Sequence, residues 1–429
     1  MFVPVSARSR QALQSDPAFD VTIVMPCLNE ALSLGHCIAN AREALARLEA
    51  LHGLSGEIVV ADNGSDDGSQ RLAAAFGARV VAVEDKGYGA ALIGGCEAAL
   101  GRFLLMGDAD GSYDFTDGVA MVGALLDGAD LCMGSRFRGG IARGAMPWKN
   151  RYIGNPVLTG ILNLFFRSGI GDAHCGLRAI TRDAFRSLRL RSAGMEFASE
   201  MVIKASLKGL RIAEVPATLS ADLRDRPPHL RPWRDGWRHL RHLLMLSPTW
   251  AFGVPALAAM GGAGLVLLTA LLHLLGALPG PGPFGTSWTI VAGSVFTVGH
   301  FASVMALATH LHGVREGFRT LRPFLRRHSR VLTLEAMLAF GIALIAGALA
   351  MLSLIAYDWA HGSFAALPSA LPVVMATTMG TVGLQTVFGG FVLAIIGGHA
   401  ADFAAEAARP RRPWNAAGRD EMPGEAPAG

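Results

Sequence analysis

Charged side chains are scarce in this chain: they make up 17% of its 429 residues, whereas 51% are hydrophobic. Soluble domains carry about 25% charged residues, so part of the chain is expected to lie outside water. The shortage is concentrated in the C-terminal half, where residues 242–314 contain no Asp, Glu, Lys or Arg, and where 336–357 and 359–401 are also uncharged. A bilayer-spanning helix needs about 20 apolar residues. These runs exclude a secreted or wholly soluble protein and predict an integral membrane protein.

Cysteine is also rare and shows no pattern of pairing. The chain has five cysteines, an odd number without a CxxC pair, and all lie before residue 240. Disulfide-stabilised secreted domains carry paired cysteines, so we expect reduced, buried thiols in a cytosolic domain. Residues 1–20 contain no apolar segment typical of a signal peptide and are expected to form a flexible tail.

Four membrane-spanning helices are predicted, near residues 250–277, 287–312, 333–357 and 371–399. The loop 313–332 contains six arginines, whereas 278–286 and 358–370 together contain one charged residue, Asp358. Because basic loops stay on the cytoplasmic side, we expect both termini and the N-terminal domain in the cytoplasm, beside the cytoplasmic (inner) membrane. The Arg- and Trp-rich segment 224–247 is expected to lie at the membrane surface.

The N-terminal half has the pattern of an α/β domain. Strands are expected at 21–25, 57–61, 79–83, 102–106 and 131–133, and helices at 31–51, 68–76 and 90–100. This alternation predicts a doubly wound, mostly parallel sheet. In such sheets ligands bind beyond the carboxyl ends of the strands. The residues that follow the predicted strands are suited to binding: Asn29, Glu30, Asp62, Lys86, Gly87, Asp108 and Asp110.

Asp108 and Asp110 form a DxD pair after the apolar run 103–106. In extended backbone, residues two apart point to the same side, so both carboxylates can face one cation. Mg²⁺ or Mn²⁺ prefers oxygen ligands and keeps positions for substrate phosphates. The pair therefore predicts a divalent metal site.

Two further loops suit a phosphorylated nucleoside. Asp62 ends a predicted strand, where its carboxylate is placed to accept hydrogen bonds from a base or ribose. Lys86 and Gly87 open a small-residue loop before a helix, and Lys86 supplies a point charge for a diphosphate or base. Neither loop is a Walker A or GxGxxG sequence, which argues against ATP hydrolysis and dinucleotide binding.

The order of these motifs resembles family 2 glycosyltransferases with a GT-A (Rossmann-like) fold, and among them the dolichyl- and polyprenyl-phosphate mannosyl- and glucosyltransferases. The motifs are Pro26…Asn29-Glu30, Asp62-Asn-Gly-Ser, Lys86-Gly-Tyr-Gly-Ala-Ala and Asp108-Ala-Asp110, and the similarity covers roughly residues 20–245. The resemblance implies that the nucleotide sugar binds at Pro26, Asn29, Glu30, Asp62, Lys86, Gly87 and Asp108. It also implies that Asp108 and Asp110 hold Mg²⁺ or Mn²⁺ with the donor diphosphate, with Asp110 catalytic.

The resemblance extends to the binding of an acceptor phosphate. It implies that Ser135, Arg136, Arg151 and Asn155 grip that phosphate, and that Arg136 and Arg151 also act in catalysis. Before the membrane, the usual Arg…Gly-x-Ser-Lys stretch is replaced by residues 224–231, so either Arg224 or Arg226 is expected to serve the acceptor phosphate. A second departure is Asn63, which stands where the family usually has the second acid of an Asp-Asp pair and leaves the nucleotide preference open.

These features predict a membrane-bound, inverting glycosyltransferase that moves a hexose from a nucleotide sugar, of the UDP-glucose or GDP-mannose class, to polyprenyl (undecaprenyl) phosphate. The helices would anchor the enzyme and orient the acceptor tail, and a homo-oligomer is compatible with them. Nucleic acid is not expected as a partner. The expected organisation is a tail (1–20), a GT-A catalytic domain (21–223), a basic interface segment (224–247), four spans (248–400) and a cytoplasmic tail (401–429).

Two alternatives stay open. A processive polysaccharide synthase, or a transferase with another lipid acceptor, would use similar donor motifs. Such a synthase would carry Gln-x-x-Arg-Trp, whereas this chain has only Leu230-Arg-Pro-Trp233. The other alternative is a glycolipid transport partner or degenerate scaffold, because four spans exceed what anchoring requires. The intact acidic pair and arginines argue against it.

Overall fold

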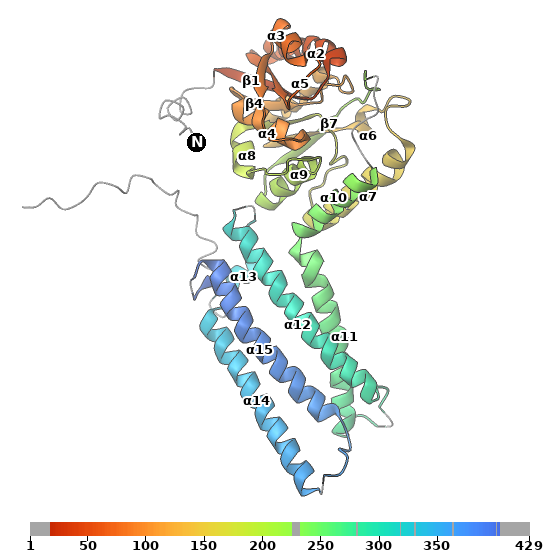
Figure 1. Cartoon of the computed structure of the whole chain (residues 1–429), viewed down its shortest axis with the longest axis vertical. Coiled ribbons are helices and arrows are strands. Elements are labelled where there is room, and N and C mark those ends of the chain that lie inside the picture. Colours follow the sequence, from red (N-terminus) through yellow and green to blue (C-terminus); the bar gives the residue numbers. More distant parts are fainter. Residues whose placement is uncertain are drawn as a thin grey trace, which may run out of the picture. The chain divides into compact units, whose positions relative to one another are not determined.

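The computed structural model describes residues 18–224, 232–279, 282–317, 319–329, 332–362, 364–399 and 401–403. The chain divides into two compact units, residues 1–251 and 252–429 (Figure 1). The first unit contains the sheet and the second contains long apolar helices. Each unit is described by itself.

Within the described residues, the first unit holds one seven-stranded sheet with the order β3-β2-β1-β4-β6-β5-β7. The strands are β1 (Phe19–Cys27), β2 (Gly56–Asp62), β3 (Arg79–Ala82), β4 (Gly101–Met106), β5 (Leu131–Ser135), β6 (Arg178–Thr181) and β7 (Ile212–Pro216). All run parallel except β6, which pairs antiparallel with both β4 and β5. The mostly parallel sheet was expected, but the sequence pattern did not reveal β6.

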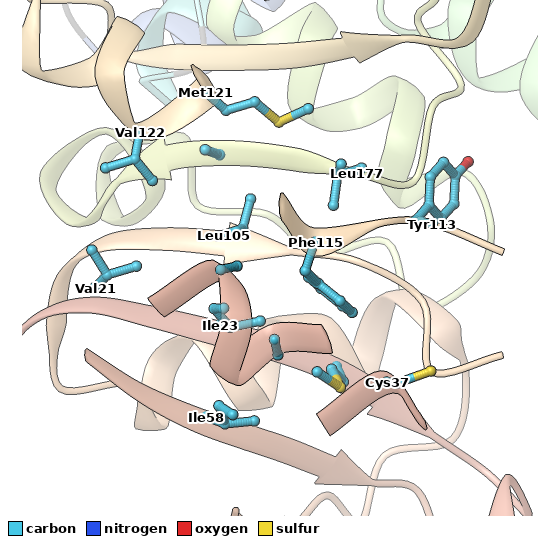
Figure 2. Packing of buried hydrophobic residues seen from close by; sticks show 14 of the residues in the cluster. Val21, Ile23, Cys37, Ile58, Leu105, Tyr113, Phe115, Met121, Val122 and Leu177 are labelled. Carbon is cyan, nitrogen blue, oxygen red and sulfur yellow. The ribbon is translucent and has the colours of Figure 1, made fainter. Parts of the chain in front are cut away.

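Helices cover both faces of this sheet. They are α2 (Ala31–His52), α3 (Ser69–Ala75), α4 (Tyr88–Ala98), α5 (Gly118–Leu126), α6 (Arg136–Gly139), α7 (Asn155–Phe166), α8 (Arg182–Leu188), α9 (Phe197–Lys208) and α10 (Pro232–Met245). Alternate strand residues serve opposite faces: Ile23 and Leu105 belong to the core cluster with α2 and α5, and Val24 and Leu104 to the cluster with α4 and α9. Figure 2 shows Val21, Ile23 and Leu105 in the first cluster. Burial on both faces explains why the strands are continuously apolar.

The second unit holds, among its described residues, α11 (Val254–Leu274), α12 (Thr286–Arg315), α13 (Pro323–Arg327), α14 (Leu334–His361) and α15 (Leu371–Gly397). Four described helices are long and apolar enough to cross a membrane: Thr249–Leu274, Thr286–Arg315, Leu334–His361 and Leu371–Gly397. The expected fold class, an α/β domain followed by about four such helices, is confirmed.

Small residues allow α14 and α15 to approach closely, as their glycine content suggests. A Cβ on Gly341 would lie 2.7 Å from the carbonyl oxygen of Gly383, and the converse distance is also 2.7 Å. Between α12 and α15, His300 Nδ1 lies 3.0 Å from Gln385 Oε1. Without water nearby, polar groups in a membrane helix are satisfied by neighbouring helices, so this pair stabilises the packing of α12 on α15.

Truncation of Leu105 should destabilise the sheet domain. Leu105 has no exposed surface and lies in the core, where a Leu→Ala change costs about 2–5 kcal/mol. Leu51, on α2, is 67% exposed, so its change to Ala should alter stability by less than about 0.5 kcal/mol. Denaturant unfolding of the detergent-solubilised protein, followed by tryptophan fluorescence, measures both variants. Equal stability of Leu105→Ala and Leu51→Ala would contradict the core assignment.

Candidate active site

The candidate site lies at the carboxyl edge of the sheet. Cys27, the last residue of β1, is in register with Asp62, the last residue of β2. Val24 of β1 is in register with Met106, at the end of β4. The loops that carry Asn29-Glu30 and Asp108-Ala-Asp110 therefore leave the sheet side by side. Pro26, which has no N–H to donate, lies beyond the residues of β1 that pair with β4, so its position costs that ladder no hydrogen bond.

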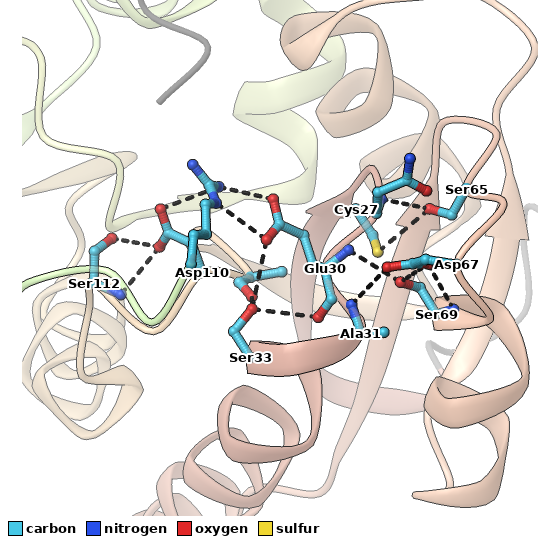
Figure 3. Close-up of polar contacts among 12 residues, drawn as sticks. Cys27, Glu30, Ala31, Ser33, Ser65, Asp67, Ser69, Asp110 and Ser112 are labelled. Carbon is cyan, nitrogen blue, oxygen red and sulfur yellow. Dashed lines mark hydrogen bonds and ion pairs between the residues drawn. The ribbon is translucent and has the colours of Figure 1, made fainter. Parts of the chain in front are cut away.

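Glu30 and Asp110 are held by one arginine (Figure 3). Arg224 Nη2 lies 2.9 Å from Glu30 Oε1 and 3.1 Å from Asp110 Oδ2, and Arg224 Nε donates to Glu30 Oε2 at 3.1 Å. Both acids are buried. Burial alone would lower the pKa of Arg224, but the charges of Asp110 and Glu30 outweigh it and raise that pKa. The carboxylates of Glu30 and Asp110 thus share the guanidinium cation of Arg224.

Arg224 contacts two of the acidic residues that the sequence assigned to the nucleotide sugar and the metal. The sequence predicted that it serves the acceptor phosphate, whereas its guanidinium bridges the residue expected to hold the nucleoside, Glu30, and the residue expected to hold the metal, Asp110. Arg226, the other candidate for the acceptor phosphate, lies outside the described residues.

Asp108 and Asp110 differ in how they are satisfied. Asp110 Oδ1 accepts hydrogen bonds from the backbone N–H and the hydroxyl of Ser112, at 3.0 and 2.6 Å. Asp108 Oδ1 is buried and has no hydrogen-bond partner. Burial, with a smaller contribution from the charge of Asp110, raises the pKa of Asp108 to about 6. A buried acceptor without a donor, next to a second carboxylate, fits a cation ligand.

The loop of the acidic pair is tied to helix α2. Ser33 Oγ donates to the backbone carbonyl of Ala109 at 2.7 Å and lies 3.5 Å from Glu30 Oε2. Asn29, with a positive φ of 58°, accepts a hydrogen bond from the backbone N–H of Asp66 at 2.8 Å. These contacts fix the loops after β1, β2 and β4 relative to one another. A cavity of about 340 Å³, lined by Asn29, Glu30, Ala31, Leu32, Ser33, Asp67 and Arg224, opens beside them.

Asp62 shapes the turn after β2. Its carboxylate accepts hydrogen bonds from Gln70 Nε2 at 2.7 Å and from the backbone N–H groups of Gly64 and Ser65 at 3.0 and 3.2 Å. Burial alone would raise the pKa of Asp62, but these hydrogen bonds outweigh it and lower that pKa. Asp62 is thus ionised at neutral pH and already has three donors. Its expected contact with a nucleoside stays a prediction.

The hydrogen bonds of Asn63 give a reason for an amide where the family usually has an acid. Its amide Nδ2 donates to the carbonyl oxygens of Val83 and Asp85, at 3.1 and 2.7 Å, and its Oδ1 accepts from Gly87 N–H at 2.8 Å. The Asn63 carbonyl accepts from Lys86 Nζ at 2.7 Å. A carboxylate here would face two carbonyl oxygens without a proton to donate. Asn63 therefore fixes the Lys86-Gly87 loop.

Arg136 lies at the end of β5 and is paired with Asp172. Its Nε and Nη2 each donate to a different Asp172 oxygen at 2.7 Å, and Asp172 is fully buried. Arg136 itself is 8% exposed, and the neighbouring Ser135 Oγ is buried without a partner. The sequence predicted a phosphate contact for both side chains. In the structure the guanidinium of Arg136 binds a carboxylate, which fits a role in positioning the loop.

Arg151 and Asn155 lie on a different element from the acidic pair. Arg151 is in a π-helical turn, Asn150–Gly154, directly before α7, with its guanidinium 5.6 Å from the centre of the Tyr152 ring. Asn155 Nδ2 lies 3.5 Å from Met146 Sδ. In the part of the chain that the structure describes, neither residue has a hydrogen bond or ion pair with Asp108 or Asp110. Their predicted role at the acceptor phosphate stays a prediction.

Sequence reasoning missed Arg178 as a site residue. It opens β6, where it is in register with Met106 of β4 and Met133 of β5, and it is 2% exposed. Its guanidinium donates to the carbonyl oxygens of Cys175 and Ala198. Its charge partly offsets the burial that raises the pKa of Asp108. A buried arginine needs such acceptors. Only the position of the antiparallel strand β6 makes this residue part of the site.

A chain of three side chains joins the Asp172 loop to α10. Ser199 Oγ on α9 lies 2.8 Å from His239 Nδ1 on α10 and 3.3 Å from His174 Nε2. Burial and the charges of His239, Arg136 and Arg178 lower the pKa of His174 well below its ordinary value. His174 is therefore neutral, as a ring beside two arginines must be. This chain fixes α10 to the sheet domain.

Two family models match the chain. The glycosyl transferase family 2 model matches residues 22–189, and the glycosyltransferase family 2 C-terminal transmembrane region matches residues 307–397. A low-salt glycan biosynthesis hexosyltransferase of Haloferax volcanii is 37% identical over 388 residues, which cover 89% of this chain and 90% of that protein. The chain belongs to glycosyltransferase family 2 and is a membrane-integral enzyme of that family.

Other similarities cover less of the chain. A dolichyl-phosphate hexose transferase of the same organism is 28% identical over 200 residues, which cover 46% of this chain and 81% of that protein. Among solved structures, mannosyl-3-phosphoglycerate synthase from Rubrobacter xylanophilus is similar with a TM-score of 0.42 and 19% identity, covering 66% of this chain and 82% of its own.

Replacement of Asn63 by aspartate should weaken nucleotide binding. The new carboxylate would face the Val83 and Asp85 carbonyl oxygens and lose both donated hydrogen bonds, a cost of about 1–3 kcal/mol. Protonation of the introduced carboxyl restores one donor, so the defect should be smaller at pH 5 than at pH 8. Calorimetric titration with UDP and GDP at both pH values measures this. A variant that binds as wild type at pH 8 would contradict the assigned role of Asn63.

Proposed function

We propose that this protein transfers a hexose from a nucleotide sugar to a polyprenyl phosphate at the cytoplasmic face of the membrane. The observation that carries the proposal is the gathering of Glu30, Asp108, Asp110 and Arg224 at the carboxyl edge of the sheet, in a family 2 glycosyltransferase with membrane-length helices. The similarity to a hexosyltransferase over most of the chain, and to a dolichyl-phosphate hexose transferase over 200 residues, supports the hexose and the lipid acceptor.

Asp108 and Asp110 fit a divalent metal ion, Mg²⁺ or Mn²⁺. The support is the unpartnered Asp108 Oδ1 beside a second carboxylate whose present partner is a cation. No cluster of three potential ligand side chains occurs among the described residues, which suits an ion that shares its coordination with substrate phosphates. When bound, the ion would neutralise charge on the departing diphosphate. Asp108 and Asp110 would hold the ion, and Asn63 would keep Lys86 beside the nucleotide.

A phosphate acceptor needs no dedicated general base. A phosphate monoester is anionic at neutral pH and attacks the anomeric carbon without losing a proton to the protein. The sugar–diphosphate bond breaks as the new bond forms, and the configuration inverts. The residues then contribute positioning and electrostatic stabilisation. Arg151, Asn155 and Arg224 are the side chains we assign to the acceptor phosphate, with Ser135 and Arg136 shaping the loop beside them.

The distribution of arginines supports a cytoplasmic site. The segment between α12 and α14 contains arginines at 319, 322, 326, 327 and 330, whereas the segment between α14 and α15 contains none. Basic residues near the ends of spans favour the cytoplasmic side. Two candidate spans separate the sheet domain from this basic segment, so both would lie on the cytoplasmic side.

Asp110→Ala should reduce transfer by at least about 100-fold, because it removes stabilisation of the developing diphosphate charge. The assay supplies membranes containing the protein, undecaprenyl phosphate, Mn²⁺ or Mg²⁺, and radiolabelled UDP-glucose or GDP-mannose, and counts lipid-extractable label released by mild acid. Asp127→Ala, which removes an exposed acid at the end of α5, is the matched control and should retain full activity.

Three results would redirect the proposal. Label in polymer would favour a processive polysaccharide synthase, and label in lipid that resists mild acid would favour another lipid acceptor. Nucleotide binding without transfer from any donor would exclude hexose transfer under these conditions and overturn the proposal.

A further inference from the structure

Helix α7 exposes an apolar face. Ile153, Val157 and Leu164 follow a helical stripe and are 53, 52 and 58% exposed, with Gly160 between the last two also exposed. Tyr152, beside the stripe, is 68% exposed. The opposite face, with Thr159, Leu162 and Phe166, is buried in the sheet domain. Both faces of the helix are therefore apolar, although one of them is exposed.

This face lacks the charges that the surface helix α2 carries. The twelve residues of α7 include no Asp, Glu, Lys or Arg. The exposed side of α2, in contrast, carries Arg42, Glu43, Arg47 and Glu49. Scattered exposed leucines are normal on a protein surface, but a contiguous uncharged stripe marks an interaction site.

Basic and aromatic residues flank the stripe at its ends. Trp148 is 62% exposed, and Lys149 and Arg151 lie with it directly before α7. Arg167 follows the helix as its C-cap. Cations beside an apolar face, with Trp and Tyr at its border, are the combination that suits a helix lying in the surface of an anionic bilayer.

Helix α7 contacts the first turn of the first membrane-length helix. Phe165 of α7 stacks on Trp250, with ring centres 5.2 Å apart and planes at 16°. Trp250 is the second residue of the first membrane-length helix, Thr249–Leu274. Helix α10 packs against α7 and exposes Trp237 and Met245, at 61 and 72%. Helix α7 therefore lies beside the residues at which the first membrane-length helix begins.

We infer that α7 and the preceding turn dock into the surface of an anionic bilayer, with Tyr152, Ile153, Val157 and Leu164 among the acyl chains and Lys149 and Arg151 at the headgroup phosphates. The docking holds Arg151 and Asn155 at the depth where a lipid phosphate lies. This last step, unlike the docking itself, rests on the proposed function.

The test measures membrane depth in the full-length protein. Single cysteines at Val157 and Leu164 are labelled with a nitroxide, and Val157→Cys, Leu164→Cys and a Leu51→Cys control on α2 are compared in nanodiscs of phosphatidylglycerol and phosphatidylcholine. The five native cysteines are buried free thiols, so labelling of wild type reports the background. We expect labels on α7 to collide more with oxygen than with a water-soluble nickel chelate, and the label at Leu51 to show the reverse.

Two outcomes would overturn the inference. Labels on α7 that are as accessible to the nickel chelate as the label at Leu51 would place the stripe in water. Dipolar broadening between α7 labels of different molecules, lost on dilution with unlabelled protein, would show that a second copy covers the stripe instead of lipid. Neither reading depends on transfer activity, so failure of the proposed function and failure of the docking are distinguishable.

A second measurement tests the consequence for the acceptor. Val157→Glu should raise the KM for undecaprenyl phosphate by about tenfold, because a charge is unfavourable where an apolar face enters the membrane, while the KM for the nucleotide sugar stays unchanged. Leu51→Glu is the matched control and should change neither. An equal loss with both substrates would show general damage to the domain and contradict a role in acceptor positioning.

Discussion

Buried carboxylates at one edge of the sheet are the constraint on which the rest of the site depends. The register of β1 with β2 and β4 brings the loops of Glu30, Asp62 and Asp110 together, and a buried carboxylate without a partner is costly. The chain meets this cost with Arg224 on Glu30 and Asp110, and with backbone and amide donors on Asp62. Only Asp108 Oδ1 among these carboxylate oxygens is buried without a partner. The same burial of carboxylates that lowers the stability of the fold leaves an edge whose charges suit a cation and a diphosphate.

The sequence predicted those features of this edge that depend on residues close together in the chain, and missed those that depend on distant residues. Local patterns were sufficient for the strand–helix alternation, because apolar runs and turn residues encode it within a few positions. They also placed Asp62, Asp108 and Asp110 at strand ends. The pairing of Arg224 with Glu30 was not predicted because the two residues lie 194 positions apart, and no local pattern encodes it. Strand β6 has only four residues, too few to show a period, and Arg178 was missed with it.

Asn63 illustrates how a departure from a family pattern acquires a physical reason. In the sequence it was a missing acid that left the nucleotide preference open. In the structure its side chain makes three hydrogen bonds to the loop that carries Lys86 and Gly87, two as donor and one as acceptor. Aspartate matches the acceptor but not the donors. The amide therefore reflects how the loop is built, and it says nothing about which base the site selects.

Arg224 also precedes helix α10 in the chain. It ends the described segment 18–224, and α10 begins at Pro232 and is fixed to the domain through His239 and Ser199. Arg224 and α10 both belong to the first unit, residues 1–251. In the proposed reaction, a metal ion on Asp108 and Asp110 would satisfy the carboxylate that Arg224 now binds, and the guanidinium would be left beside two phosphates that need a cation. In this proposal Arg224 pairs with Glu30 and Asp110 before the substrates bind, and contacts the acceptor phosphate afterwards. The arriving phosphates bring negative charge to the edge, and additional cations are needed to balance it.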